Sequence, residues 1–198
     1  MIEVDNLLPP VFLNEIKSIL HGDKFPWFYY ESVGSNDEDV DIPKHPQSIR
    51  IPGFVHILVY TGDNGPIVNS ECWETVKPIS YFISDRCNMD FKNIVRCKVN
   101  MTTPIPRRDF DKDNFSIPHI DHRGINNTTA IFYVDDSDGD TVIFNEVYDG
   151  SIPESVTVKD RVKPKSNKLI VFDGNMYHAG SLPLDYKSRI TINFNFEV

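Results

Sequence analysis

The chain has 198 residues, a length that fits one domain, and its hydrophobic content of 40% and aromatic content of 12% suffice for a core. A formal net charge of −9 argues against nucleic acid as a partner, because proteins that bind nucleic acid usually carry a basic surface. The three cysteines are scattered, no apolar run is long enough to span a membrane, and the N-terminus lacks the pattern of a secretory signal. We therefore expect a cytoplasmic protein with free thiols, whose oligomeric state the sequence leaves open.

The first half of the chain contains two helical regions and one clear strand. Residues 9–21 carry apolar side chains at helical spacing, which predicts a short amphipathic helix packed across a sheet. Residues 54–60 are almost entirely apolar and predict a buried strand. Residues 70–88 are predicted to be helical in part, with Ser70 as a cap and Pro78 opening a second short helix.

Two segments between these elements have unusual composition. Residues 25–30 are densely aromatic, which favours a place in the core and leaves open a place in the wall of a binding mouth. Residues 34–53 are rich in acidic residues, proline and glycine, and we expect a mobile loop or lid there.

From residue 93 onward the chain reads as short strands separated by turns. This spacing, with no helical pattern between the strands, predicts a β-sandwich or barrel, so the fold class is mainly β with flanking α-helices. The predicted strands cover residues 93–101, 117–121, 128–135, 140–146, 155–160, 168–172 and 188–196.

Three side chains in this half have the chemistry of a metal site. His119 and Asp121 are two residues apart, so in an extended strand both project from the same face. His178 is a second imidazole, placed just after a later predicted strand. Two imidazoles and one carboxylate that leave three positions open form the facial triad of non-haem Fe(II) oxygenases, although a zinc ion can use the same ligands. His122 would point to the opposite face and is the weaker ligand candidate.

Arg189 is the second residue of the last predicted strand and suits an anionic ligand. Its planar guanidinium makes two parallel hydrogen bonds to a carboxylate and is always charged. Strand alternation places Thr191 and Asn193 on the same face, where they could support the same carboxylate. A zinc site alone would not need this arginine.

The order H-x-D, distal His and an Arg eleven residues later resembles the Fe(II)/2-oxoglutarate-dependent dioxygenase superfamily, most of all its prolyl-hydroxylase-like branch. The resemblance implies a single oxygenase domain, with a double-stranded β-helix (jelly-roll or cupin-like) core in residues 93–198 and supporting helices and strands in residues 1–92. It implies Fe(II) held by His119, Asp121 and His178, with 2-oxoglutarate as co-substrate and O₂ as oxidant. A role for ascorbate stays open.

The resemblance also implies roles for two further residues and shows two departures. Tyr133 matches a tyrosine that contacts the distal carboxylate of 2-oxoglutarate, and Asn100 lies on the strand where relatives often place another co-substrate ligand. The spacing from His178 to Arg189 is slightly longer than is common in the prolyl-hydroxylase-like branch. The nucleic-acid demethylases of the superfamily carry a second arginine six residues after the first, and Asn195 stands there.

The resemblance implies hydroxylation of a peptidyl, prolyl-like, or amino-acid substrate, with 2-oxoglutarate decarboxylated to succinate. Two alternatives remain: a catalytically inactive β-helix binding module, and a cupin-like zinc or manganese enzyme that uses no 2-oxoglutarate. The regions that correspond to the family's substrate loops, 25–53 and 102–116, carry no diagnostic motif. Arg107 and Arg108 could meet an acidic substrate, but two adjacent arginines are more typical of a solvated loop.

Overall fold

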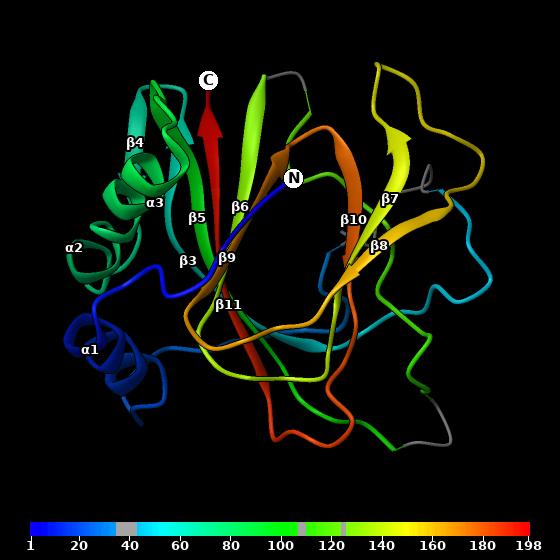
Figure 1. Ribbon diagram of the computed structural model, residues 1–198, viewed down its shortest axis with the longest axis horizontal. Coiled ribbons are helices and arrows are strands. Elements are labelled where there is room, and N and C mark those ends of the chain that lie inside the picture. The colour runs from blue at the N-terminus through cyan, green and yellow to red at the C-terminus, as the bar shows by residue number, and fades with distance from the viewer. Residues whose placement is uncertain (35–42, 107–109, 124–125) are drawn as a thin grey trace.

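The computed structural model describes residues 1–34, 43–106, 110–123 and 126–198 (Figure 1). In these ranges the strands are β1 (Ile2–Val4), β2 (Phe28–Tyr30), β3 (Gly53–Gly62), β4 (Gly65–Val68), β5 (Asn93–Thr102), β6 (Asn127–Tyr133), β7 (Thr141–Val147), β8 (Val158–Val162), β9 (Lys168–Asp173), β10 (Met176–Gly180) and β11 (Arg189–Glu197).

The strands form two antiparallel sheets that face each other. The major sheet has the order β1–β9–β6–β11–β5–β3–β2, with β4 paired to β3, and the minor sheet has the order β10–β7–β8. Between the sheets lies an apolar cluster that joins Ile131, Ile170 and Phe172 of the major sheet to Ile143 and Val162 of the minor sheet. This arrangement is the one predicted for a double-stranded β-helix.

Three helices cover the outer face of the major sheet (Figure 1). They are α1 (Pro10–Leu20), α2 (Trp73–Val76) and α3 (Ile79–Cys87), which confirms the two predicted helical regions. Ser70 is not the cap of α2, because Cys72 holds that position and the Ser70 hydroxyl instead accepts a hydrogen bond from the Cys72 amide at 3.2 Å. Pro78 directly precedes α3, as predicted. No helix in the described ranges is long and apolar enough to cross a membrane.

β11 is buried on both of its faces, and this determines where the polar residues of the sheet point. Its apolar side chains alternate with polar ones and pack in the main core under the helices. The polar face turns inward, between the two sheets, because the helices occupy the other side. The neighbouring strand β5 repeats the pattern, so polar residues face one another across the two strands in the pairs Arg189–Thr102, Thr191–Asn100, Asn193–Lys98 and Asn195–Arg96.

Two predicted strands differ from the structure. Residues 117–121 are not a strand: Pro118 has no amide hydrogen to donate, and the segment pairs only through a bridge between His119 and His178. The strand predicted over 155–160 begins three residues later, as β8. The other predicted strands of the second half are confirmed as β5, β6, β7, β9 and β11.

The aromatic segment 25–30 divides between the core and the surface. Phe25 is buried, but Phe28, Tyr29 and Tyr30 are exposed, so the preferred core placement is wrong for these three. Their strand, β2, is the last of the major sheet and pairs only with β3, which leaves its side chains uncovered. Of the loop or lid expected over 34–53, residues 35–42 lie outside the described residues, and residues 43–52 form no helix or strand.

Candidate metal centre

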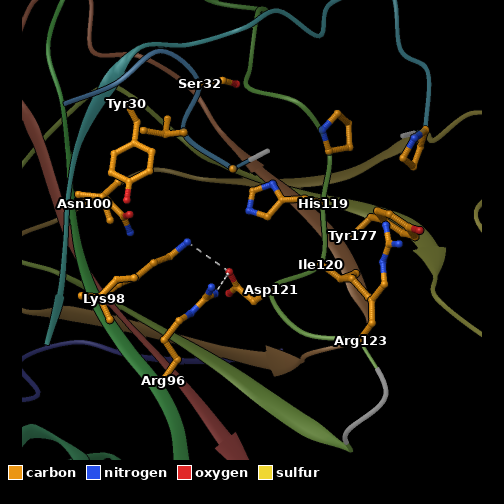
Figure 2. A pocket seen from close by; sticks show the side chains of 16 residues that line it. Tyr30, Ser32, Arg96, Lys98, Asn100, His119, Ile120, Asp121, Arg123 and Tyr177 are labelled. Carbon is orange, nitrogen blue, oxygen red and sulfur yellow. Dashed lines mark hydrogen bonds and ion pairs between the residues drawn. The ribbon is translucent and has the colours of Figure 1, made fainter. Parts of the chain in front are cut away.

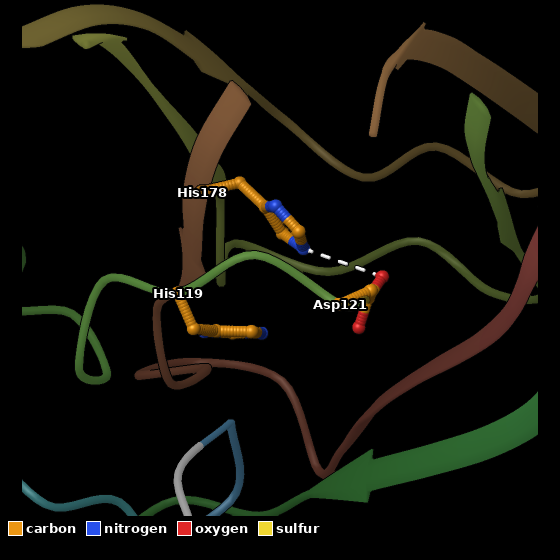
Figure 3. Close-up of side chains that lie close together, drawn as sticks. All are labelled: His119, Asp121 and His178. Atoms are coloured by element: carbon orange, nitrogen blue, oxygen red, sulfur yellow. Dashed lines mark ion pairs between the residues drawn. The ribbon is translucent and has the colours of Figure 1, made fainter. Parts of the chain in front are cut away.

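The structure brings His119, Asp121 and His178 into one cluster, with one ligand atom of each within 4.8 Å of the others (Figure 3). The two histidines come from segments that lie side by side. The amide of His119 donates to the carbonyl of His178 at 3.0 Å, and the reverse bond is 2.9 Å. Pairing of the two backbones therefore fixes the distance between the two imidazoles.

Both imidazoles turn the same nitrogen toward the centre. Nδ1 of His119 lies 2.9 Å from the carbonyl oxygen of Ile117, and Nδ1 of His178 lies 3.2 Å from that of Met176. A carbonyl oxygen only accepts hydrogen bonds, so each Nδ1 carries the proton and each Nε2 presents a lone pair. Nε2 of His178 is buried and has no hydrogen-bond partner in the described chain. Such a nitrogen calls for a cation, as a metal ligand would.

His119 also has the protonation state that a metal requires. Burial, followed by the nearby charge of His178, lowers the pKa of His119 to about 3. The imidazole is therefore neutral across the physiological range, and a metal ion does not have to displace a proton from it.

Asp121 is an ionised carboxylate with both oxygens engaged (Figure 2). Oδ1 lies 2.6 Å from Nη2 of Arg96 and 3.5 Å from Nζ of Lys98, while Oδ2 accepts a 3.0 Å hydrogen bond from Nδ2 of Asn195. Burial alone would raise the pKa of Asp121, but the charges of Lys98 and Arg96 outweigh it and hold this pKa well below its usual range. Oδ2 is also 3.6 Å from Nε2 of His178, so this oxygen faces the centre.

The donor set fits a divalent transition ion. Two neutral imidazole nitrogens and one carboxylate oxygen converge from one side and leave the other side to a cavity. Fe(II) with three open positions suits this set, and zinc can also use it.

A narrow second cavity leads from the two histidines to Arg189. Nε of Arg189 donates to the carbonyl of Gly139 and Nη2 to Oγ1 of Thr141, both at 2.7 Å. The guanidinium is buried, and no carboxylate of the described residues lies within ion-pair distance of it. A buried unpaired cation is costly, so this cavity is built for an anion.

Other polar groups of the same cavity also lack partners. Oγ1 of Thr102 and Oδ1 of Asn193 are buried and make no hydrogen bond in the described chain, and Asn100 and Thr191 line the cavity beside them. A polar ligand is therefore needed to satisfy these groups.

Tyr133 lies behind Arg189 rather than in the cavity wall. The Arg189 guanidinium is 5.8 Å from the centre of the Tyr133 ring, and the tyrosine hydroxyl donates to Oγ1 of Thr141 at 2.7 Å. Burial raises the pKa of Tyr133 to about 12. Thr141, which lines the cavity and contacts both residues, was missed by the sequence reasoning.

The structure leaves the remaining basic candidates outside the cluster. His122 turns Nδ1 toward the carbonyl of Arg123 at 3.2 Å and does not join the three ligands. Arg107 and Arg108 lie outside the described residues. Arg96, Lys98 and Asn195, which hold Asp121, were not predicted as site residues, although they follow the same strand alternation as Asn100 and Asn193.

A larger cavity of about 500 Å³ adjoins the metal centre, and its lining includes His119 and Asp121 but not Arg189 (Figure 2). Tyr30 and Asn100 line one of its walls and Tyr177 another. Its size falls in the range of small-molecule and side-chain pockets, roughly 300–1,000 Å³.

Comparison with known proteins identifies the fold. No family model and no curated protein matches the chain. A 2OG-Fe(II) oxygenase family oxidoreductase from Burkholderia pseudomallei superposes with a TM-score of 0.65 at 14% identity, over 99% of this chain and 84% of that one. A prolyl hydroxylase from Trichoplax adhaerens, in complex with a hypoxia inducible factor peptide, gives 0.59 at 16% identity, over 99% and 82%. A Pseudomonas putida prolyl-4-hydroxylase gives 0.54 at 12% identity, over 99% and 91%.

At these identities the likeness establishes the fold. The chain has the double-stranded β-helix of the 2OG-Fe(II) oxygenases, which confirms the predicted fold class. The sequence resemblance is strong from about residue 93 to 198 and thin before that, whereas the likeness in fold extends over 99% of the chain.

Proposed function

We propose that this chain is an Fe(II)- and 2-oxoglutarate-dependent dioxygenase, most simply a hydroxylase, in which the whole chain acts as one oxygenase domain. The observation that carries the proposal is that two adjoining cavities each contain a buried polar group without a partner of opposite charge. Nε2 of His178 is a buried acceptor that calls for a cation, and Arg189 is a buried cation that calls for an anion. A metal ion chelated by a dicarboxylate would satisfy both.

In this proposal His119, Asp121 and His178 hold Fe(II), and Arg189 holds the far carboxylate of 2-oxoglutarate. Thr191, Asn193 and Asn100 line the path between them, while Tyr133 supports Arg189 and Thr141 from behind. When bound, Fe(II) and 2-oxoglutarate supply the oxidising chemistry: one oxygen atom of O₂ enters the substrate as a hydroxyl group, and the other enters succinate as CO₂ is released.

The protein's own part is to orient and to exclude water. Backbone carbonyls hold Nδ1 of both histidines, so each Nε2 keeps its direction when a ligand leaves or enters. Burial of Arg189 keeps the charge pairing strong, because competing water is absent.

For the substrate we propose a peptidyl, prolyl-like, or amino-acid side chain in the larger cavity. The solved Trichoplax adhaerens prolyl hydroxylase is bound to a peptide, which supports this class. The cavity of about 500 Å³ has room for a side chain and its neighbours. The acidic net charge and the presence of Asn195, where nucleic-acid demethylases carry an arginine, favour a substrate other than nucleic acid.

The proposal is tested by adding Fe(II) and then 2-oxoglutarate to the apoprotein without air. We expect the weak visible charge-transfer band of a chelated keto acid, and we expect His178→Ala to abolish it. His122→Ala is the matched control, because this histidine lies next to the site but outside the ligand cluster.

The other outcomes separate the alternatives. Iron binding without a band would contradict 2-oxoglutarate chelation and support an enzyme that uses another metal without this co-substrate. Failure to bind any divalent ion would support an inactive binding module.

A further inference from the structure

The walls of the larger cavity are cationic although the protein is acidic. Arg96, Lys98 and Arg123 line this cavity, and Asp121 is the carboxylate among its described lining residues (Figure 2). The chain as a whole has a net charge of −9. The positive lining is therefore a local feature of the site, and a general basic surface does not account for it.

Asp121, the carboxylate among the described lining residues, already has other partners. Asp121 pairs with Arg96 at 2.6 Å and with Lys98 at 3.5 Å, and in the proposed function it also binds the metal ion. The charges of a divalent ion and of a 2-oxoglutarate dianion cancel each other. With Arg189 paired to the far carboxylate of 2-oxoglutarate, the loaded centre leaves Arg96, Lys98 and Arg123 facing Asp121, the carboxylate among the described lining residues.

Lys98 keeps unused donors close to the metal centre. Its ammonium carries three N–H groups, and its ion pair in the described chain is the 3.5 Å contact with Asp121. The side chain is 13% exposed, so little water competes for these donors. A charged group held in this environment gains from an anion placed beside it.

Arg123 lies across the cavity from Lys98 and Arg96, beside Tyr177 (Figure 2). Its guanidinium stacks 5.8 Å from the centre of the Tyr148 ring, and no carboxylate of the described residues lies within 4.0 Å of it. The hydroxyl of Tyr177 is buried without a hydrogen-bond partner. Arg123 and Tyr177 thus present donors on the cavity wall opposite β5.

We propose that the substrate of this chain is anionic, with a carboxylate or phosphate group held by Arg123 and with Lys98 and Arg96 providing further positive charge nearer the metal centre. For a peptide, this places an acidic residue close in sequence to the residue that is oxidised. The inference rests on the proposed function and narrows its substrate class. Arg123 stands two residues after Asp121, so the Cα atoms of these two residues are at most about 7 Å apart, which is about the length of two residues of extended peptide.

The test uses sulfate as the probe, because it carries charge and is independent of the substrate's identity. Protein loaded with Fe(II) and saturating 2-oxoglutarate is titrated with sulfate by calorimetry, without air and at low ionic strength. Saturating 2-oxoglutarate covers Arg189, so the remaining cations are those of the larger cavity. We expect a millimolar dissociation constant that rises at least fivefold in Arg123→Gln.

Two further variants serve as controls for the sulfate titration. Arg123→Lys keeps the charge and should retain most of the sulfate affinity, which separates loss of charge from loss of folding. Arg86→Gln makes the same chemical change on the exposed face of α3 and should leave the affinity unchanged. Absence of sulfate binding, or equal binding by wild type and Arg123→Gln, would overturn the inference.

The same samples separate this inference from the proposed function. A charge-transfer band together with no Arg123-dependent sulfate binding overturns the anionic substrate alone. Absence of the band with Fe(II) and 2-oxoglutarate overturns the proposed function, and the substrate inference falls with it.

Discussion

Arg189 makes its two hydrogen bonds with the nitrogen atoms that a lysine lacks. Nε reaches the Gly139 carbonyl and Nη2 reaches Thr141, which leaves the rest of the fork for a ligand. A lysine at this position keeps the positive charge but loses the planar pair of donors. We expect Arg189→Lys to raise the 2-oxoglutarate concentration for half-maximal turnover at least tenfold, about 1.4 kcal/mol, with a smaller change in maximal rate. Arg86→Lys on α3 is the control, and an unchanged co-substrate requirement would remove Arg189 from its proposed role.

Asn195 is expected to position Asp121 for the metal. Its amide donates to Oδ2 of Asp121 at 3.0 Å and to Oγ1 of Thr129 at 3.1 Å, and its own oxygen accepts a 3.2 Å bond from Arg96. Loss of such a supporting hydrogen bond typically weakens metal binding by about 10–100-fold. Asn195→Ala should therefore lower Fe(II) affinity by about tenfold in a competition titration against a chelator. The exposed Asn93→Ala on β5 is the comparison, and equal affinities would show that Asp121 needs no such support.

Tyr133 adds a pH dependence at the alkaline side. Its pKa of about 12 in the folded protein lies above the ordinary value of 10.0, so the folded state holds the proton more tightly than the unfolded state. The stabilisation is complete below pH 10 and is lost as the pH rises from 10 toward 12. We expect the unfolding free energy of Tyr133→Phe to fall less steeply than that of wild type in this window, measured by urea titration. Tyr81→Phe, at an exposed tyrosine of α3, is the control; equal slopes for wild type and Tyr133→Phe would contradict this prediction.

The residues proposed to contact the metal ion or the co-substrate were easier to predict than the residues that contact Asp121. His119, Asp121, His178 and Arg189 have metal-binding or anion-binding chemistry in a spacing that resembles the oxygenase family, so the sequence indicated them. Arg96 and Lys98 alternate with Val95 and Cys97, a pattern that equally fits a strand with one face in water. Their inward direction depends on the helices that cover the opposite face, and nothing in the local sequence reveals that cover.

At the scale of the elements, long apolar strands were predictable and short connecting ones were not. β11 and β9 are runs of branched and aromatic residues, a composition that favours strands wherever it occurs. β10 was missed because it begins three residues after β9 ends, across a tight turn that contains Gly174. The opposite error at 117–121 has a related origin, because Pro118 allows one bridge but not a continued ladder.

The turn between β9 and β10 needs a glycine. A Cβ at Gly174 would overlap the side chain of Asn127 and lie 2.6 Å from its carbonyl oxygen, which accepts a 2.8 Å hydrogen bond from the Gly174 amide. We expect Gly174→Ala to lower the unfolding free energy by about 1–3 kcal/mol, and also to weaken metal binding because the turn leads directly to His178. Gly180→Ala, at the end of β10, is the stability control, since the nearest contact of its Cβ would be 3.5 Å. Chemical denaturation gives the unfolding free energy of both variants. If Gly174→Ala lowers it no more than Gly180→Ala does, the prediction is contradicted.

At the scale of the whole molecule, ligands of the centre should stabilise the fold. The cluster joins residues 119–121, which lie outside the strands, to β10 of the minor sheet, and Arg189 belongs to the major sheet, so a bound ion and dicarboxylate tie the two sheets together. At one hundred times the dissociation constant a ligand contributes about 2.7 kcal/mol, which for a chain of this size corresponds to a rise in melting temperature of roughly 5–10 °C. We expect this rise with Mn(II), which avoids oxidation, plus 2-oxoglutarate, and its loss in His178→Ala. An equal rise in the variant would mean that the ligands act elsewhere on the protein.

The inward polar face of β5 and β11 lowers the stability of the fold and supplies groups that the proposed activity requires. Arg189, Thr102 and Asn193 sit where most domains place leucine or valine, and each is costly to bury without a partner. Apolar replacements at these positions would make the fold more stable but inactive, because the same polar groups are proposed to bind the co-substrate. Binding of the co-substrate would give these buried groups partners, so the loaded protein would not bear the cost that the empty protein does.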